Sequence, residues 1–310
     1  MPLFNKTPNF DFMGPRRLAT GISVILIGAS LISILVRGLN LGVEFTSGVL
    51  LEVGYETAID LESVRATLNS EGYENSRVQF FGAATDVLIR LPPVENVEEG
   101  ASLGEQAFVA LQARDPSVEL RRVEFVGPQV GEDLREQGGL AMLFALIMIF
   151  AYVMLRFRWK FAAGAIAALV HDVVITLGFF SIVGLSFDLS ILAAVLAVIG
   201  YSLNDTIVIY DRIRENFRLI RRGTAVDIIN TSINQTLART LITGITTLFV
   251  LLALLFLGGE TVYGFSVALI TGVLIGTYSS IYVASSAALA LDVSPTDLIL
   301  QKREEADEMP

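Results

Sequence analysis

Six long apolar segments, separated by polar stretches, set the pattern of this chain. They cover Leu18–Val36, Gly139–Leu155, Phe161–Leu185, Leu189–Tyr210, Ile233–Leu257 and Val262–Ala290. An α-helix needs ~20 residues to cross the hydrocarbon core of a bilayer, and these segments approach or exceed that length. The first is too long for the apolar region of a cleaved signal peptide, so we expect a retained anchor. The pattern predicts an α-helical polytopic membrane protein with six transmembrane helices.

The polar stretch of residues 37–138 lies between the first two apolar segments and is long enough for one small domain. Strand-like alternation occurs at Gly48–Val53, around Val78, at Val87–Leu91 and at Val118–Val126. Helices are predicted at Thr57–Ser70, capped at Thr57, and after the capping box Ser102-x-x-Glu105. The order strand–helix–strand–strand–helix–strand predicts an α+β ferredoxin-like domain.

Lysine and arginine gather on one side of the predicted spans. Arg16 and Arg17 precede the first span, whereas the turns Ser186–Asp188 and Gly258–Thr261 have no basic residue. The other basic clusters follow the second, fourth and sixth spans: Arg156, Arg158 and Lys160; Arg212, Arg214, Arg218, Arg221 and Arg222; Lys302 and Arg303. Because such clusters stay in the cytoplasm, we expect a cytoplasmic N-terminus (1–17), loop (211–232) and tail (291–310). Residues 37–138 then form an extracytoplasmic domain.

Charge and composition narrow the possible functions. The net charge is −10, the mean hydropathy is +0.62, and the chain has no Cys and one His. The region from Arg37 to Gln137 has 8 basic and 18 acidic residues and so holds the whole acidic excess, which argues against nucleic-acid binding. The lack of Cys excludes disulfides and thiolate chemistry. Because we find no nucleotide-binding, metal-ligating or catalytic pattern, we expect no enzyme, cofactor or metal. Any work must draw on a partner or an ion gradient.

Ionisable residues inside predicted spans are the strongest candidates for function, because each costs ~2.5–3.5 kcal/mol at a helix centre. Asp205 and Arg239 lie at similar depth on sequential helices, so they can form a pair. In one interpretation this pair relays protons, because a moving guanidinium switches the carboxylate between holding and releasing a proton. In the other it is a static ion pair that fixes helix register. Asn204 adds polar capacity beside it.

Other polar and small residues in the spans have weaker signals. His171 and Asp172 either hydrogen-bond to neighbouring helices or face a proton pathway. The hydroxyl of Thr240 either relays protons or bonds back to its own helix. Small residues predict close helix packing, at Gly200 together with Ala193 and Ala197 and at Gly272 together with Gly276.

Several strings taken together resemble one family. They are Leu41-Gly-Val-Glu-Phe-Thr-Ser-Gly48, Val126-Gly-Pro-Gln-Val-Gly-Glu-Asp-Leu134, His171-Asp-Val-Val-Ile-Thr-Leu-Gly178, Gly200-Tyr-Ser-Leu-Asn-Asp-Thr206 and Asn234-Gln-Thr-Leu-Ala-Arg-Thr240. In this order and spacing they resemble the SecF family of protein-export membrane proteins, within the SecD/SecF group and the RND superfamily. The resemblance covers nearly the whole chain.

The resemblance implies a six-helix half that pairs with SecD, associates with the SecYEG channel and YajC, and acts on unfolded preprotein. It implies the proton-motive force as the energy source, with protons as the coupling ion, in a cytoplasmic (inner) membrane. It also links Asp205 and Arg239 to proton conduction. A scaffold that stabilises the translocon without conducting protons is the alternative, and a stand-alone exporter of small molecules or lipids is a third hypothesis.

The family motifs near the two ends of residues 37–138 form an expected hinge between the domain and the membrane. The residues that match them are Gly42, Glu44, Phe45, Gly127, Pro128 and Gly131. The first family motif usually reads G-(I/V)-D-F-x-G-G; here Glu44 stands in place of Asp, and Ser47 stands in place of the first Gly of the closing Gly-Gly pair. We therefore expect a hinge that is stiffer or differently paired.

Overall fold

A computed structural model describes residues 8–74, 76–94, 96–157, 159–220 and 222–293. Within these residues, six helical segments are long and apolar enough to span a membrane. They are α1 (Arg16–Arg37), α5 (Pro128–Arg156), α6 (Trp159–Val183), α7 (Leu189–Leu219), α8 (Ala225–Leu257) and the continuous stretch Glu260–Ala290. This confirms the six predicted spans. Most of the predicted tail 291–310 and the first seven residues lie outside the described residues.

Three helices extend well beyond the apolar segments that predict them. Helix α5 begins at Pro128, eleven residues before Gly139, so its first three turns belong to the stretch assigned to the polar domain. Helix α7 runs on to Leu219 and α8 begins at Ala225, so most of the predicted loop 211–232 is helical. Hydropathy marks the apolar part of a helix and not its ends, because Arg, Glu and Gln continue a helix into water readily.

The last span is interrupted. It consists of α9 (Glu260–Ser279), a π-helical turn (Ser280–Ala284) and α10 (Ser285–Ala290). A π-helical turn inserts an extra residue into the helical repeat and is frequent at functional sites. Here it places both Ser279 and Ser280 in the buried interior of the bundle.

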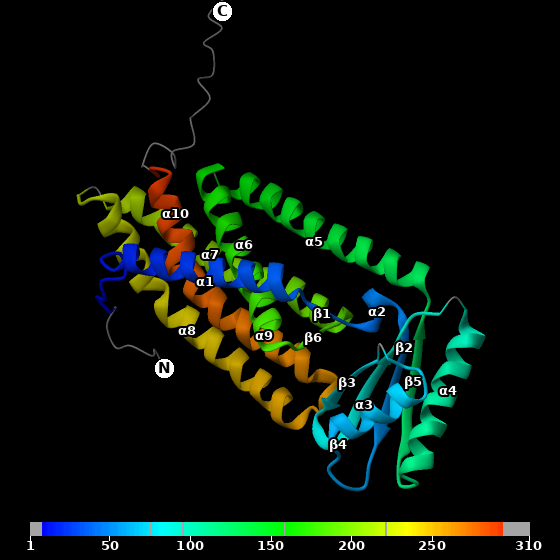
Figure 1. The fold of residues 1–310 in the computed structure, drawn as a ribbon. Coiled ribbons are helices and arrows are strands. Elements are labelled where there is room, and N and C mark those ends of the chain that lie inside the picture. Colours follow the sequence, from blue (N-terminus) through cyan, green and yellow to red (C-terminus); the bar gives the residue numbers. More distant parts are fainter. Residues whose placement is uncertain (1–7, 75, 95, 158, 221, 294–310) are drawn as a thin grey trace, which may run out of the picture.

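Helices α6 and α7 form the centre of the bundle, and α1, α5, α8 and α9 pack around them (Figure 1). Helix α9 lies close against α7 because Gly272 and Gly276 leave room for Val198 and Ser202. The close packing predicted at these two glycines is therefore present. At Gly200 the prediction is wrong within this chain, because Gly200 is exposed and has no atom of another element within 4 Å of an added Cβ.

The α+β domain between α1 and α5 has the predicted ferredoxin-like order. Its elements are β2 (Gly48–Gly54), α3 (Leu61–Ser70), β3 (Arg77–Phe81), β4 (Ala83–Leu91), α4 (Val97–Arg114) and β5 (Glu119–Val126). The strands form one antiparallel sheet in the order β3-β4-β2-β5. Alternate residues of β2 and β4, among them Leu51 and Ile89, form the core with α3 and α4. The hairpin between β3 and β4 turns at Gly82, where φ is +79°.

Both predicted helix caps in the domain are wrong. Helix α3 begins after Asp60, whose carboxylate accepts from the Glu62 amide, and not at Thr57. Helix α4 begins after Asn96, whose side chain accepts from the Glu99 amide at 2.9 Å, so Ser102 lies inside the helix. The apolar spacing used for the prediction marks the turns that pack on the sheet, and polar helical turns precede them.

The domain is fixed to one end of the bundle, far from the α5–α6 and α7–α8 connections (Figure 1). Short strand β1 (Asn40–Leu41), directly after α1, pairs in parallel with β6 (Ser186–Phe187), between α6 and α7. The short helix α2 (Val43–Thr46) follows and contacts α5. The chain that leaves α1 is therefore attached to the central helices before it enters the sheet.

Candidate functional site

Asp205 lies on α7 in the interior of the bundle, as expected of an ionisable residue in a span. It is 3% exposed, and its Oδ2 is buried without a hydrogen-bond partner among the described residues. Buried polar atoms are nearly always paired, so an unpaired carboxylate oxygen in an apolar bundle requires a specific explanation. Asp205 is thus a buried carboxylate whose hydrogen bonding is incomplete among the described residues.

Arg239 on α8 does not form the predicted ion pair with Asp205 in this structure. The two charges interact electrostatically, but no ion pair joins them, and Arg239 is exposed on the surface of the bundle. The helix α8 packs on α7 and α9 along one side only, and Arg239 lies on its outer side. Equal depth along two helices does not fix the rotation of either helix, which is why the sequence could not decide this point.

Asn204 and Thr240, which adjoin Asp205 and Arg239 in the sequence, differ in their burial. Asn204 is exposed on α7 and makes no hydrogen bond with any described residue. Thr240 is buried, and its hydroxyl has no partner, so it neither bonds back to its helix nor relays a proton through a visible contact. The hydroxyls of Thr243 and Thr246 bond back to their own helix, which is the common arrangement.

His171 and Asp172 on α6 lie at the centre of a buried polar network. Both are at most 2% exposed, and His171 Nδ1 lies 2.9 Å from Asp172 Oδ1. Ser202 on α7 and Ser279 on α9 donate to Asp172 Oδ2 at 2.6 and 2.7 Å. Asp172 therefore accepts hydrogen bonds from two neighbouring helices, as one of the two interpretations of the sequence expects. A further contact joins His171 and Asp172 themselves.

The network continues from His171 to α1. His171 Nε2 lies 3.2 Å from Ser23 Oγ, which lies 3.1 Å from the Tyr278 hydroxyl. Tyr278 donates to the carbonyl of Ala19 at 2.7 Å. Sequence reasoning missed these hydroxyl residues, and no signal could have found them, because most hydroxyls in membrane helices bond to their own backbone.

The hinge residues lie where the resemblance places them, around α2 and the start of α5. Gly42 precedes α2, and its amide donates to the Phe187 carbonyl at 2.7 Å. Phe45 is buried and stacks on Phe187 with ring centroids 5.9 Å apart. Gly127 precedes α5 and Pro128 opens it, which suits a first turn whose amides lack partners. An added Cβ at Gly131 would overlap the Ser47 hydroxyl.

Ser47 has a backbone conformation that normally belongs to glycine. Its φ is 64° and its ψ is 169°, a region that costs a residue with a Cβ about 1–3 kcal/mol. This explains physically why the family motif has Gly at this position. A serine in this conformation stores backbone strain directly after α2.

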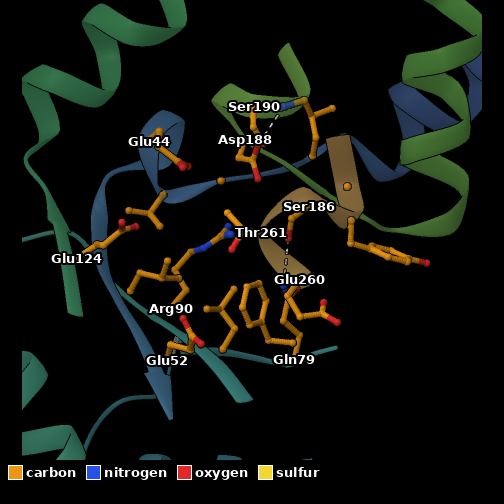
Figure 2. Close-up of a pocket in the computed structure, with 18 of the residues that line it drawn as sticks. Glu44, Glu52, Gln79, Arg90, Glu124, Ser186, Asp188, Ser190, Glu260 and Thr261 are labelled. Atoms are coloured by element: carbon orange, nitrogen blue, oxygen red, sulfur yellow. Dashed lines mark hydrogen bonds between the residues drawn. The ribbon is translucent and has the colours of Figure 1, made fainter. Parts of the chain in front are cut away.

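A cavity of about 660 Å³ separates the sheet of the α+β domain from the adjoining ends of α7 and α9. Figure 2 shows Arg90, from β4, among the carboxylates around the cavity. Those carboxylates belong to Glu44, Glu52, Glu124, Asp188 and Glu260. Arg90 also donates to the Leu41 carbonyl, which ties the sheet to β1.

Glu44 has an altered proton affinity at this junction. Burial raises the pKa of its carboxyl above the ordinary value of 4.5, and the negative charges of Asp188 and Glu124 raise it further. Its own backbone hydrogen bond and the positive charge of Arg90 lower it less. The folded chain therefore binds a proton at Glu44 more tightly than the unfolded chain does.

Replacing Ser47 by Gly should stabilise the hinge. We expect Ser47→Gly to raise the free energy of unfolding by roughly 1–2 kcal/mol, because relief of backbone strain exceeds the added entropy of the unfolded chain. Thermal unfolding of the purified full-length chain in detergent measures this. Ser102→Gly, in the regular helix α4, is the control and should lose about 0.5 kcal/mol. A loss of stability at position 47 would show that Ser47 is not strained.

The pH dependence of stability tests the environment of Glu44. Because its folded pKa is raised, its protonation contributes stability that is fully present below pH 4.5 and is lost as pH rises through the folded pKa. We expect Glu44→Gln to exceed the parent in thermal midpoint at pH 8 and to match it near pH 4. Glu105→Gln, on the exposed side of α4, is the matched control. A difference that does not vary with pH contradicts the assignment.

Family models match most of the chain. The model for the C-terminal part of the protein-export membrane proteins SecD and SecF matches residues 107–294, and the SecD/SecF GG motif matches residues 32–59. The second match includes Glu44 and Ser47, and the first includes α5 and all the helices after it.

Curated relatives and solved structures agree with these matches. The protein translocase subunit SecF of Vibrio alginolyticus is 50% identical over 304 residues, covering 96% of each chain. That of Pseudomonas aeruginosa is 49% identical over 308 residues, covering 98% of this chain and 99% of its own. The crystal structure of SecDF from Thermus thermophilus, a translocon-associated membrane protein, is 37% identical with a TM-score of 0.85. A SecDF structure in a super-membrane-facing form is 38% identical with a TM-score of 0.69.

The match to SecDF covers 94% of this chain but only 40% of the SecDF chain, so this chain corresponds to one part of that longer protein. Sequence identity near one half to the curated SecF proteins over almost the full length, together with the structural match to SecDF, assigns the chain to one family. The chain belongs to the SecF family of protein translocase subunits, multi-pass membrane proteins of the Sec protein-export machinery.

Proposed function

We propose that this chain couples the proton-motive force to protein export and that Asp205 holds the proton in transit. The observation that carries the proposal is the buried Asp205 carboxylate, one of whose oxygens has no partner. An unpaired anion is unfavourable in an apolar bundle, so the site favours binding of a proton from the side where protons are abundant. The nearby charge of Arg239 favours release when it approaches.

We also propose SecD as the partner that completes the site. Arg239 is exposed on an apolar helix, which is costly if the helix faces lipid. On α7 the small residues Ala193, Ala197 and Gly200 form an exposed stripe that leads to Asn204. Small residues allow close approach of another helix. A partner helix on this stripe would cover Asn204 and bring its own polar groups towards Asp205.

We further propose that the chain lies in the cytoplasmic membrane with the α+β domain outside. Both the α5–α6 and the α7–α8 connections lie at the bundle end opposite the domain, and described basic residues such as Arg156, Lys160 and Arg222 adjoin them, which supports cytoplasmic termini under the positive-inside rule. The family assignment extends the proposal to SecYEG and YajC as further partners and to unfolded preprotein as substrate. In a second reading the chain is a scaffold, and its buried charges only fix helix packing.

Loss of the Asp205 proton should remove the proton-dependent part of export. We expect Asp205→Asn to assemble normally but to reduce release of a secretory protein to the level seen with a protonophore. Asp211→Asn makes the same change at the exposed end of the same helix and should keep release within about twofold, because its ion pair with Arg156 is a surface pair. Assembled Asp205→Asn that exports as the parent does would support the scaffold reading.

The surface of α7 can be tested directly because the chain has no cysteine. We expect a nitroxide on Ala197→Cys to be accessible to oxygen in the isolated chain in lipid and to lose most of that accessibility when SecD is co-purified. A nitroxide on Leu143→Cys, on the exposed side of α5, should remain accessible in both samples. Equal accessibility at Ala197 with and without SecD would place the partner elsewhere.

A further inference from the structure

The network around His171 and Asp172 permits a count of its protons. Each hydroxyl has one proton to donate, and the observed bonds determine where most of these protons lie. Tyr278 uses its proton on the Ala19 carbonyl, at 2.7 Å. The 3.1 Å contact between Ser23 and Tyr278 must therefore use the proton of Ser23. Only the imidazole is then left to supply the proton in the contact between Ser23 and His171.

This assigns one proton to His171 Nε2. A second proton lies between His171 Nδ1 and Asp172 Oδ1, because two bare lone pairs would not approach to 2.9 Å. Whether this second proton is closer to nitrogen or to oxygen, the pair holds two protons and has no net charge. Asp172 Oδ2 already accepts from two serine hydroxyls and needs no further donor.

We propose that the His171–Asp172 pair is a second proton-binding site of the chain, separate from Asp205, and that its proton governs how tightly α1 is held to α9. If one proton leaves, the remaining proton stays on Nδ1 beside the carboxylate and Nε2 becomes an acceptor. Ser23 then turns its proton to Nε2, and Tyr278 can bond either to Ser23 or to Ala19 but not to both. Release of the proton thus removes one of the two hydrogen bonds between α1 and α9.

The surroundings of the pair contain few other groups that could take the proton. Among the described residues, α1 contributes Ser23, α7 contributes Ser202, and α9 contributes Ser279 and Tyr278 to its hydrogen bonds. Tyr278 is the titratable member, and it stacks on His171 with ring centroids 6.0 Å apart. No charged side chain among the described residues hydrogen-bonds to the pair, so its net charge changes by a full unit when the proton leaves.

The His171–Asp172 pair lies between Asp205 on one side and the helix that leads to the α+β domain on the other. On α7, Asp205 lies one turn beyond Ser202, the donor to Asp172. At this level Ser280 contacts the Thr206 hydroxyl at 2.8 Å and donates to the Ser202 carbonyl at 3.3 Å. On the other side, α1 leads directly into β1 and the α+β domain. Loosening α1 from α9 would therefore free the helix from which the domain extends.

The single histidine of the chain makes the proposal testable without export. In full-length protein labelled with ¹⁵N-histidine and reconstituted in lipid, every histidine signal comes from His171. We expect Nε2 to be protonated at low pH and to become bare in one step as pH rises, while Nδ1 keeps its proton. Nε2 that stays protonated from pH 5 to pH 9, or Nδ1 that loses its proton first, would overturn the proposal.

Two tyrosine variants test whether the Ser23 hydroxyl gives its proton to Tyr278. Tyr278→Phe frees the Ser23 proton for Nε2 in advance, so we expect it to weaken proton binding at Nε2 about tenfold, the effect of one net hydrogen bond. Tyr282→Phe makes the same change in the adjacent π-helical turn, where the ring packs on Tyr278, and should leave the titration unchanged. An equal effect of both variants would overturn the assignment of protons.

The proposal deepens the proposed function, and one further variant separates the two. We expect Asp205→Asn to leave the order of proton loss at His171 as in the parent, whatever its effect on export. If Asp205→Asn exports normally while Nε2 still titrates, the proposed function fails and the second site stands. If export is lost while Nε2 does not titrate, the second site fails and the role of Asp205 stands.

Discussion

The structure depends on how an apolar helix bundle accommodates carboxylates away from water. Asp172 is accommodated completely, because its two oxygens receive hydrogen bonds or contacts from α6, α7 and α9. Asp205, one turn from the Ser202 that serves Asp172, has an oxygen with no partner. A satisfied polar network stiffens a core, whereas an unsatisfied group in low dielectric is costly and must find a proton or a partner. Two carboxylates in one bundle therefore have different roles.

Helix α1 connects this internal arrangement to the α+β domain. Near its middle it contributes Ser23 to the buried network, and after its last residue the chain pairs with the turn between α6 and α7. The next elements are the short helix α2 and the strained Ser47. Only a few residues therefore separate α1 from Glu44 at the edge of the cavity in Figure 2.

Hydropathy was sufficient for the six spans, and alternation was sufficient for the order of the sheet, because both signals come from burial. The apolar pattern was insufficient to predict helix ends, as the caps at Asp60 and Asn96 show, because polar turns extend helices without changing that pattern. The free-energy cost of an ionisable residue in a membrane span was enough to single out four candidate site residues: Asp205, Arg239, His171 and Asp172. Their partners could not be predicted in this way, since hydroxyl contacts depend on helix rotation and on the π-helical turn that places Ser279 and Ser280 inwards.

The exposed surface of α7 gives the last step of this reasoning. A helix that forms the centre of the bundle normally has its small residues turned inwards, but here Ala193, Ala197 and Gly200 lie on the surface. Arg239 lies on the surface as well, although the large exposed side chains that follow it on α8, such as Ile242, Ile245 and Phe249, are apolar. Each feature is unfavourable towards lipid and favourable towards another helix with polar groups. Because the match to SecDF covers 94% of this chain and only 40% of the SecDF chain, this bundle corresponds to one part of a longer protein, and the exposed polar and small residues lie on a surface that the rest of that protein could cover.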